Sequence, residues 1–263
     1  MQKLLVFTDI HFTPHGETII GLDPEARFAE GLAHAVERHP DAAHLLITGD
    51  LAHSGAVGEY ERLQNALKDC PIPVHLMLGN HDDRQNFLHV FPDTPKTEAG
   101  FIQDVIDLGD HTRLILLDTL NENTPGRHNG RLCQNRLDWL TTALSDANER
   151  QVLLFMHHPP TRSGFPGMDA IGLLDVEAFS EVLRNYSNVR QIVAGHVHRT
   201  IHGAFRSGIL QQIPVTVFKS TCHQMPMNLI VEHSDLSVDE PGAYGILLVE
   251  KEEIVVHTED FTL

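Results

Sequence analysis

Short runs of apolar residues recur along the first 200 residues, and amphipathic segments separate them. The runs lack the alternation of half-exposed strands, so we predict strands that are buried on both faces. They lie at 3–8, 44–48, 74–78, 113–117, 151–156 and 191–194. Apolar side chains at helical spacing predict helices after Asp23, at 59–69, at 134–147 and after Asp175. This rhythm predicts an α/β fold with parallel strands joined by right-handed crossovers.

The pattern changes near residue 200. Residues 200–222 predict two or three antiparallel strands, and 243–249 with 254–261 predict a hairpin. The segment between them, Met225 to Gly242, is long for a connection, and loops of that length are usually functional or mobile. The C-terminal part therefore has a different architecture from the rest of the chain.

Five of the predicted strands end in oxygen or imidazole side chains. These are Asp9 and His11, Asp50, Asn80, His157, and His196 with His198. Parallel sheets hold their ligands beyond the carboxyl ends of the strands, so we expect these side chains to converge. A mixture of carboxylate, amide and imidazole favours a borderline transition metal. Seven donors exceed the needs of one ion, whereas two ions that share one carboxylate would use all of them, with water at the remaining positions.

Composition narrows the classes of partner. The 263 residues carry a formal net charge of −17, which argues against tight binding to a nucleic-acid backbone. Two bound dications would offset four of these charges locally, so an anionic substrate remains admissible. No apolar stretch approaches the roughly 18 residues of a membrane span.

The cysteines and the N-terminus predict a cytoplasmic setting. Cys70, Cys133 and Cys222 are odd in number and show no C-x-x-C spacing, which favours reduced thiols. The apolar run Leu4 to Phe7 is too short for a secretory signal, and polar residues follow it directly.

The strand-end motifs together resemble one known family. They are Asp9-Ile10-His11, Gly49-Asp50, Gly79-Asn80-His81-Asp82, His157 and Gly195-His196-Val197-His198. Five motifs in this order resemble the calcineurin-like metallophosphoesterases, especially the bacterial class III cyclic-nucleotide phosphodiesterase and glycerophosphodiesterase branch. The resemblance implies a four-layer αββα sandwich of two mixed sheets flanked by helices, with two metals at its top.

The resemblance also divides the chain. It implies a metallophosphoesterase core at residues 1–200. We expect residues 201–263 to form a β-rich extension that completes the second sheet. This extension either caps the site, its own or a neighbour's, or forms the contact of a homo-oligomer.

The family pattern assigns the donors to two ions, with iron, manganese, zinc and cobalt as candidate metals. By the resemblance, Asp9, His11 and His198 hold the first ion, Asn80, His157 and His196 hold the second, and Asp50 bridges. In D-x-H and H-x-H, side chains two residues apart on an extended chain point to the same side and can meet one ion. His81 is implied to be a catalytic residue that reaches toward the phosphate; the alternative is a residue that orients a neighbouring group.

The function implied is hydrolysis of small phosphodiesters by a metal-bound hydroxide. The substrate would be a cyclic nucleotide such as 3',5'-cAMP, or a glycerophosphodiester. A phosphomonoesterase, a phosphonate ester hydrolase or a nuclease would use the same site, because the rim selects the leaving group. A non-catalytic scaffold is the remote alternative, since this chain lacks none of the donors.

Five further residues have expected places near the site. We expect His158 to pack behind the ligands, and His53 and Asp83 to lie on the rim. His223 follows the predicted C-terminal strands, where a substrate contact is one interpretation. Phe12 is expected either to wall the cleft or to pack in the core.

Overall fold

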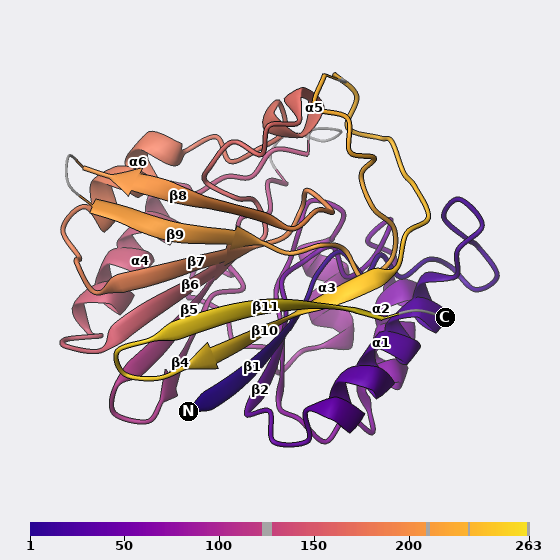
Figure 1. Ribbon diagram of the computed structural model, residues 1–263, viewed down its shortest axis with the longest axis horizontal. Helices are drawn as coiled ribbons and strands as arrows, with labels where there is room; N and C mark the ends of the chain where they lie inside the picture. The colour runs from indigo at the N-terminus through magenta and orange to yellow at the C-terminus, as the bar shows by residue number, and fades with distance from the viewer. Residues whose placement is uncertain (123–127, 209–210, 231, 262–263) are drawn as a thin grey trace.

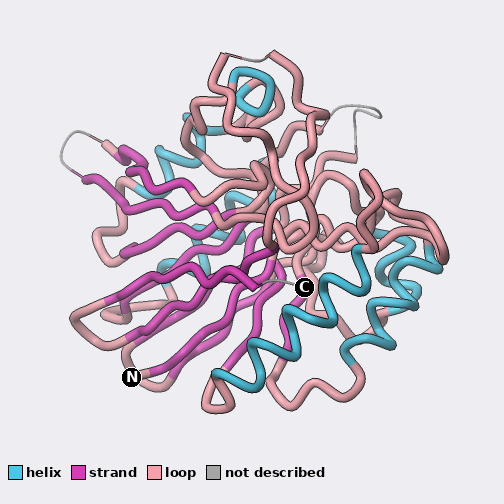
Figure 2. Tube along the Cα trace, turned by 45° about the vertical axis from the view of Figure 1, so that its right-hand side comes forward, coloured by secondary structure: helices cyan, strands magenta, loops and turns pink. Residues whose placement is uncertain are grey.

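The structure is a computed structural model in which residues 1–122, 128–208, 211–230 and 232–261 are described. Two β-sheets pack face to face, and helices cover the outer face of each (Figure 1 and Figure 2). Three apolar clusters fill the space: one between the sheets and one beneath each helical layer. The predicted four-layer αββα sandwich is therefore confirmed.

The first sheet has five strands in the order β11-β10-β1-β2-β3. Its strands are β1 (Gln2–Phe7), β2 (His44–Ile47), β3 (Val74–Leu76), β10 (Gly242–Val249) and β11 (Ile254–Phe261). β1, β2 and β3 are parallel, while β10 is antiparallel to both of its neighbours. The helices packed on this sheet are α1 (Pro24–Arg38), α2 (Val57–Leu67) and α3 (Arg84–Val90).

The second sheet has six strands in the order β4-β5-β6-β7-β9-β8. They are β4 (Asp104–Leu108), β5 (Thr112–Leu117), β6 (Gln151–Met156), β7 (Val189–Ala194), β8 (Ile201–Ser207) and β9 (Gln211–Val217). β5, β6, β7 and β9 are parallel, and β4 and β8 form antiparallel edges. The helices packed on it are α4 (Gln134–Ser145), α5 (Pro166–Asp169) and α6 (Val176–Leu183).

β1 shows why the predicted strands lack alternation. Leu4 and Val6 pack between the two sheets, whereas Leu5 and Phe7 pack beneath the helices. All four side chains are fully buried. A strand covered on both faces requires apolar residues at every position, and the sequence supplies them.

The predicted helix after Asp23 begins as its sequence indicates. The Asp23 carboxylate accepts hydrogen bonds from the N–H groups of Glu25 (3.0 Å) and Ala26 (3.2 Å), and Pro24 occupies the first turn. Phe28 and Ala35 on the inner face are fully buried against the first sheet.

Three short elements were not predicted: α3, β4 and α5. α3 has only seven residues, too few for a clear helical period, and begins with Asp83 as its N-cap. The Asp83 carboxylate accepts from the N–H of Asn86 at 2.8 Å. β4 is an edge strand paired only with β5 and mostly half-buried, so its apolar signal is weak.

The C-terminal strands contribute to both sheets. β8 and β9 form an edge hairpin of the second sheet, and β9 also pairs parallel with β7. β10 instead pairs with β1 in the first sheet, from Gln2↔Val249 to Val6↔Gly245. This pairing supplies hydrogen-bond partners to the backbone N–H and C=O groups on the second edge of β1, which would otherwise be unpaired. Residues 209–210 and 231, within the predicted C-terminal strands and loop, lie outside the described residues.

No described helix is both long and apolar enough to cross a membrane. The three cysteines all lie in the described part of the chain and are free thiols, as predicted.

Candidate metal centre

The seven predicted donors converge where the carboxyl ends of β1, β2, β3, β6 and β7 meet. Figure 1 shows the parallel strands of both sheets running toward the same end of the molecule, where the long loops gather. Asp50, which follows β2 in the first sheet, lies among imidazoles from both sheets. Its Oδ2 is 3.3 Å from Nε2 of His157 and 3.7 Å from Nε2 of His11.

The first group of donors consists of Asp9, His11, Asp50 and His198. Each offers one ligand atom, and these atoms all lie within 4.8 Å of one another. Nε2 of His198 is 3.4 Å from Oδ1 of Asp9 and 3.1 Å from Nε2 of His11. Two carboxylates and two imidazoles at these distances can surround one borderline cation.

The second group consists of Asn80, His157 and His196, with Asp50 shared. Oδ1 of Asn80 lies 3.1 Å from Nε2 of His157 and 2.8 Å from Nδ1 of His196. The H-x-H pair divides between the groups, because His196 faces Asn80 and His198 faces Asp9, whereas Asp9 and His11 of D-x-H both belong to the first group. The donor set fits two cations that share the carboxylate of Asp50.

The backbone at the donors is held in an uncommon conformation. Among the described residues, seven non-glycine residues have positive φ, and five of them are donors. These five are Asp9 (52°), His11 (48°), Asp50 (49°), His196 (73°) and His198 (57°). Such conformations cost of order 1–3 kcal/mol each and persist where the surrounding structure imposes them. Left-handed residues thus carry the donors that follow β1, β2 and β7.

Two glycines of the motifs allow the loops to touch. A Cβ atom at Gly79 would lie 2.2 Å from Oδ1 of Asp50, and one at Gly195 would lie 1.9 Å from Oγ1 of Thr8. Any side chain at either position would therefore push the strand ends apart.

Asp82 ties the loop after β2 to the loop after β3. Its buried carboxylate accepts hydrogen bonds from the N–H groups of Gly79 (2.8 Å), Ala52 (3.0 Å) and Leu51 (3.2 Å). The hydroxyl of Tyr60 donates to it at 3.0 Å. The sequence placed Asp82 in a motif without a role; the structure makes it the residue that fixes Asp50 and Asn80 relative to each other.

The electrostatics of the centre favour bound positive charge. Burial raises the pKa of Asp50, but His157 and other histidines outweigh burial and hold it well below its usual range. Burial lowers the pKa of His157, but Asp50 outweighs it and raises the pKa to about 9. Burial, with His157 nearby, lowers the pKa of His196 to about 3, which leaves a neutral imidazole able to act as a ligand.

Backbone carbonyls orient two of the donor rings. Nδ1–H of His157 donates to the carbonyl of Thr48 at 2.9 Å, and Nδ1–H of His198 donates to the carbonyl of His223 at 2.8 Å. Each bond leaves Nε2 directed at the carboxylates, as is usual for histidine ligands. The C-terminal region therefore helps to build the centre.

His81 lies beside the donors without belonging to either group of four. Its backbone N–H donates to Oδ1 of Asp50 at 2.9 Å, and its ring Nδ1–H donates to the carbonyl of His53 at 2.7 Å. Its ring centroid is 4.7 Å from that of His11. His81 also lines the cavity above the centre.

Of the other expected residues, His53 and His223 line that cavity. His158 is fully buried, and its Nδ1 accepts from the hydroxyl of Thr119 at 2.8 Å. Phe12 is fully buried in the first helical layer, with its ring 5.5 Å from that of Phe28, so the core alternative holds.

The cavity above the donors has a volume of about 370 Å³. Histidines form its floor, and apolar side chains form much of its wall, including Ile20, Met168, Met225 and Leu236. Met168 belongs to α5. Met225 and Leu236 belong to the C-terminal loop, which therefore walls the site of its own chain.

Two arginines hold this C-terminal loop. Nη1 and Nη2 of Arg199 donate to the carboxylate of Glu240 at 2.7 and 2.8 Å. Arg27 donates to the carbonyl of Glu240 at 2.8 Å and pairs with Asp239. Asp239 and Glu240 therefore anchor the cavity wall.

One residue at the site was missed by sequence reasoning. Nδ2–H of Asn80 donates to Nδ1 of His128 at 2.8 Å, and the His128 ring lines the cavity. The ring centroids of His128 and His81 are 5.1 Å apart. His128 lies in a loop and follows no strand directly, so no pattern distinguished it from the other histidines of the chain.

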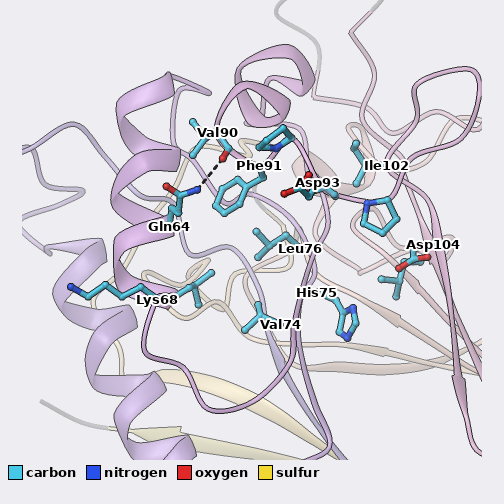
Figure 3. A pocket seen from close by; sticks show the side chains of 15 residues that line it. Gln64, Lys68, Val74, His75, Leu76, Val90, Phe91, Asp93, Ile102 and Asp104 are labelled. Atoms are coloured by element: carbon cyan, nitrogen blue, oxygen red, sulfur yellow. Dashed lines mark hydrogen bonds between the residues drawn. The ribbon is translucent and has the colours of Figure 1, made fainter.

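A second cavity, of about 590 Å³, lies at the edge of the sandwich between β3 and β4. Figure 3 shows that Val74, Leu76, Phe91 and Ile102 form its apolar walls, with His75 beside them. None of the seven donors lines it. It is the larger cavity, but it lacks the chemistry of the first.

A two-sheet αββα sandwich with two groups of donors around one shared aspartate defines the class of metal-dependent phosphoester hydrolases. The comparisons agree. A family model described as calcineurin-like phosphoesterase matches residues 2–200. The chain belongs to the calcineurin-like phosphoesterase family.

Similar proteins and a similar solved structure agree with this family and its fold. The chain is 38% identical over 261 residues to a protein of Rhodopseudomonas palustris named a probable cyclic nucleotide phosphodiesterase, covering 99% of this chain and 93% of the relative. It is 28% identical to the glycerophosphodiester phosphodiesterase of Enterobacter lignolyticus, covering 83% and 77%. A crystal structure of a dimetal phosphatase from Danio rerio superposes with a TM-score of 0.74 at 16% identity, covering 98% and 96%, which supports the fold.

Proposed function

We propose that this protein is a phosphodiesterase that hydrolyses small phosphodiesters with two metal ions. The observation that carries the proposal is the position of Asp50 between the two groups of donors, 3.3 Å from His157 and 3.7 Å from His11. Asp9, His11 and His198 would hold one ion, Asn80, His157 and His196 the other, and Asp50 both. Ions held in this way lower the pKa of bound water toward about 7 and neutralise charge on the phosphoryl group.

The residues around the donors have separate roles in the proposal. His81, fixed by its bond to the His53 carbonyl, presents Nε2 to the substrate. When both of its ring nitrogens carry a proton, His81 gives the Nε2 proton to the leaving-group oxygen and is left as the neutral ring with its proton on Nδ1. Asp82 holds the two loops that carry Asp50 and Asn80. The apolar wall excludes water from one side of the reacting group.

The proposed substrate is a cyclic nucleotide such as 3',5'-cAMP. The name of the Rhodopseudomonas relative supports this choice, and so does the apolar wall, which suits the face of a nucleobase. A glycerophosphodiester is the second candidate, supported by the name of the Enterobacter relative.

We also propose the finer assignments expected from the sequence. The ions are iron, manganese, zinc or cobalt, because the donors mix imidazole with carboxylate and amide oxygens. The protein acts in the cytoplasm, as the free thiols favour. Residues 1–200 form the core, and the extension at 201–263 carries a homo-oligomer contact, which size-exclusion chromatography with light scattering tests.

Turnover after reconstitution with defined metals tests the function. Protein loaded with manganese, zinc, cobalt or iron is assayed on 3',5'-cAMP, glycerophosphocholine and bis(p-nitrophenyl) phosphate, with p-nitrophenyl phosphate as the monoester. The proposal predicts higher kcat/KM for diesters than for the monoester, with cAMP the best. Faster turnover of the monoester contradicts the diester assignment, and inertness with all four metals contradicts the function.

A further inference from the structure

The amide of Asn80 is oriented by contacts on both of its sides. Its Oδ1 faces Nε2 of His157 (3.1 Å) and Nδ1 of His196 (2.8 Å). Its Nδ2 therefore faces Nδ1 of His128 at 2.8 Å. An amide nitrogen only donates, so Nδ1 of His128 is the acceptor. A neutral imidazole that accepts at Nδ1 carries its proton on Nε2.

A buried chain of hydrogen bonds holds the backbone at His128. Its carbonyl accepts from Nε2–H of His158 at 3.1 Å. Nδ1 of His158 in turn accepts from the hydroxyl of Thr119 at 2.8 Å. His158 is fully buried, so this support is rigid. The sequence suggested only packing for His158; its second contact is with the loop that carries His128.

His81, beside His128, has the opposite arrangement. Its Nδ1–H donates to the carbonyl of His53 at 2.7 Å, so the neutral ring has an unprotonated Nε2. The two rings are stacked at 5.1 Å with an interplanar angle of 30°, and both line the cavity. One ring thus offers a hydrogen-bond acceptor and the other a donor.

We propose that His128 binds the substrate, with Nε2–H donating to a non-bridging oxygen of the phosphodiester. The inference rests on the proposed function and assigns a substrate contact to a residue outside the family motifs. A fixed donor suits an oxygen whose negative charge grows in the transition state. Asn80 then has two roles, since its oxygen faces the metal centre and its nitrogen sets the tautomer of His128.

Two amide substitutions at His128 test its two contacts separately: the Nε2–H donor to the substrate and the Nδ1 acceptor for Asn80. In His128→Asn, the side-chain oxygen can still accept from Asn80, but the donor at the Nε2 position is lost. In His128→Gln, the longer side chain places an N–H near the Nε2 position and loses the acceptor for Asn80. His111→Asn is the matched control, because His111 is exposed at the turn between β4 and β5.

The assignment predicts a distinct result for each variant. His128→Asn retains two ions per chain and loses about 10²-fold in kcat, by the same factor for p-nitrophenyl and alkyl leaving groups. It also binds inorganic phosphate more weakly in calorimetry of the manganese-loaded protein. His128→Gln keeps most of kcat at saturating metal but binds the second ion about 10- to 100-fold more weakly. His111→Asn resembles the wild type.

Other results overturn the assignment. Wild-type phosphate affinity in His128→Asn shows that the Nε2 donor does not contact the phosphoryl group. Loss of the second ion in that variant, or a loss of kcat that grows with the pKa of the leaving group, also contradicts it. Phosphate binding does not require turnover, so an inert wild-type protein would refute the proposed function while the contact of His128 is still measured.

Discussion

Asp50 and His157 lie 3.3 Å apart, from Oδ2 to Nε2, although they follow strands of different sheets. Asp50 follows β2 of the first sheet and His157 follows β6 of the second. The proposed centre therefore depends on how the sheets are packed, and Asp50 joins its two halves. Of the remaining donors, Asp9, His11 and His198 form one group with Asp50, and Asn80 and His196 form the other group with His157.

Asp50→Asn should remove the shared carboxylate while keeping its size. The amide cannot provide two anionic oxygens, so both ions should bind more weakly. We expect kcat/KM for a diester to fall by more than about 10³-fold, equivalent to about 4 kcal/mol of transition-state stabilisation. Steady-state kinetics with metal analysis measures this change. Activity within tenfold of the wild type would contradict the role of Asp50.

Gly79→Ala should separate the loops after β2 and β3. The new Cβ would lie 2.2 Å from Oδ1 of Asp50, so the backbone must move. We expect a loss of about 1–3 kcal/mol in the free energy of unfolding, together with weaker metal binding. Urea unfolding with and without manganese measures both.

Gly58→Ala is the matched control for this substitution. Gly58 lies in α2, and a Cβ there meets nothing within 4 Å. Its substitution should stabilise the helix by about 0.5–1 kcal/mol. Equal effects of the two variants would contradict the close approach at Gly79.

Glu240→Gln should loosen the wall of the cavity without altering the metal centre. It breaks a two-point ion pair with Arg199, which directly follows the donor His198. Partly exposed pairs of this kind contribute up to about 1 kcal/mol, so KM should rise by up to about fivefold while kcat and metal content are unchanged. Glu252→Gln, in the exposed β10–β11 turn, is the control. A fall in kcat with an unchanged KM would count against a role in the wall.

His75 should make the fold sensitive to acid. Burial, with a smaller contribution from His44 at 3.0 Å, lowers the pKa of His75 from 6.5 to about 4. The unfolded chain then binds a proton at pH 4–6.5 that the folded chain does not. Stability is therefore complete above about pH 6.5 and falls as the pH falls toward 4.

His75→Gln should reduce this sensitivity. Between pH 7 and pH 5, the wild type should lose about 1–2 kcal/mol more of its unfolding free energy than the variant. Urea unfolding of both proteins with chelator at the two pH values measures the difference, with exposed His111→Gln as the control. Equal losses in the wild type and His75→Gln would show that the lowered pKa does not affect stability.

Much of the architecture followed from local pattern. Apolar runs such as Leu4 to Phe7 indicated doubly covered strands, and donors directly after them indicated one meeting point. The pairing of β10 with β1 was not predictable, because it depends on a long-range register that neither strand encodes alone. α3 and β4 are too short or too exposed to show a period.

As with the fold, the part of the site that depends on local sequence motifs was predictable, and the part that depends on long-range contacts was not. Motif spacing brought together donors such as Asp9 and His198, and the positive φ at five donors explains how they turn inward, which residue type does not reveal. The place of His128 at the site could not be predicted from the sequence, because its contact with Asn80 depends on the path of a loop. The same holds for Arg199 and Glu240, which meet only when the C-terminal loop folds back.

Manganese titration followed by electron paramagnetic resonance shows whether one aspartate joins two ions. Ions that share Asp50 lie about 3.5–4 Å apart and should be magnetically coupled. We expect two ions per chain with a coupled signal, and loss of the coupling in Asp50→Asn. A single ion per chain, or two ions with independent signals in the wild type, would contradict it.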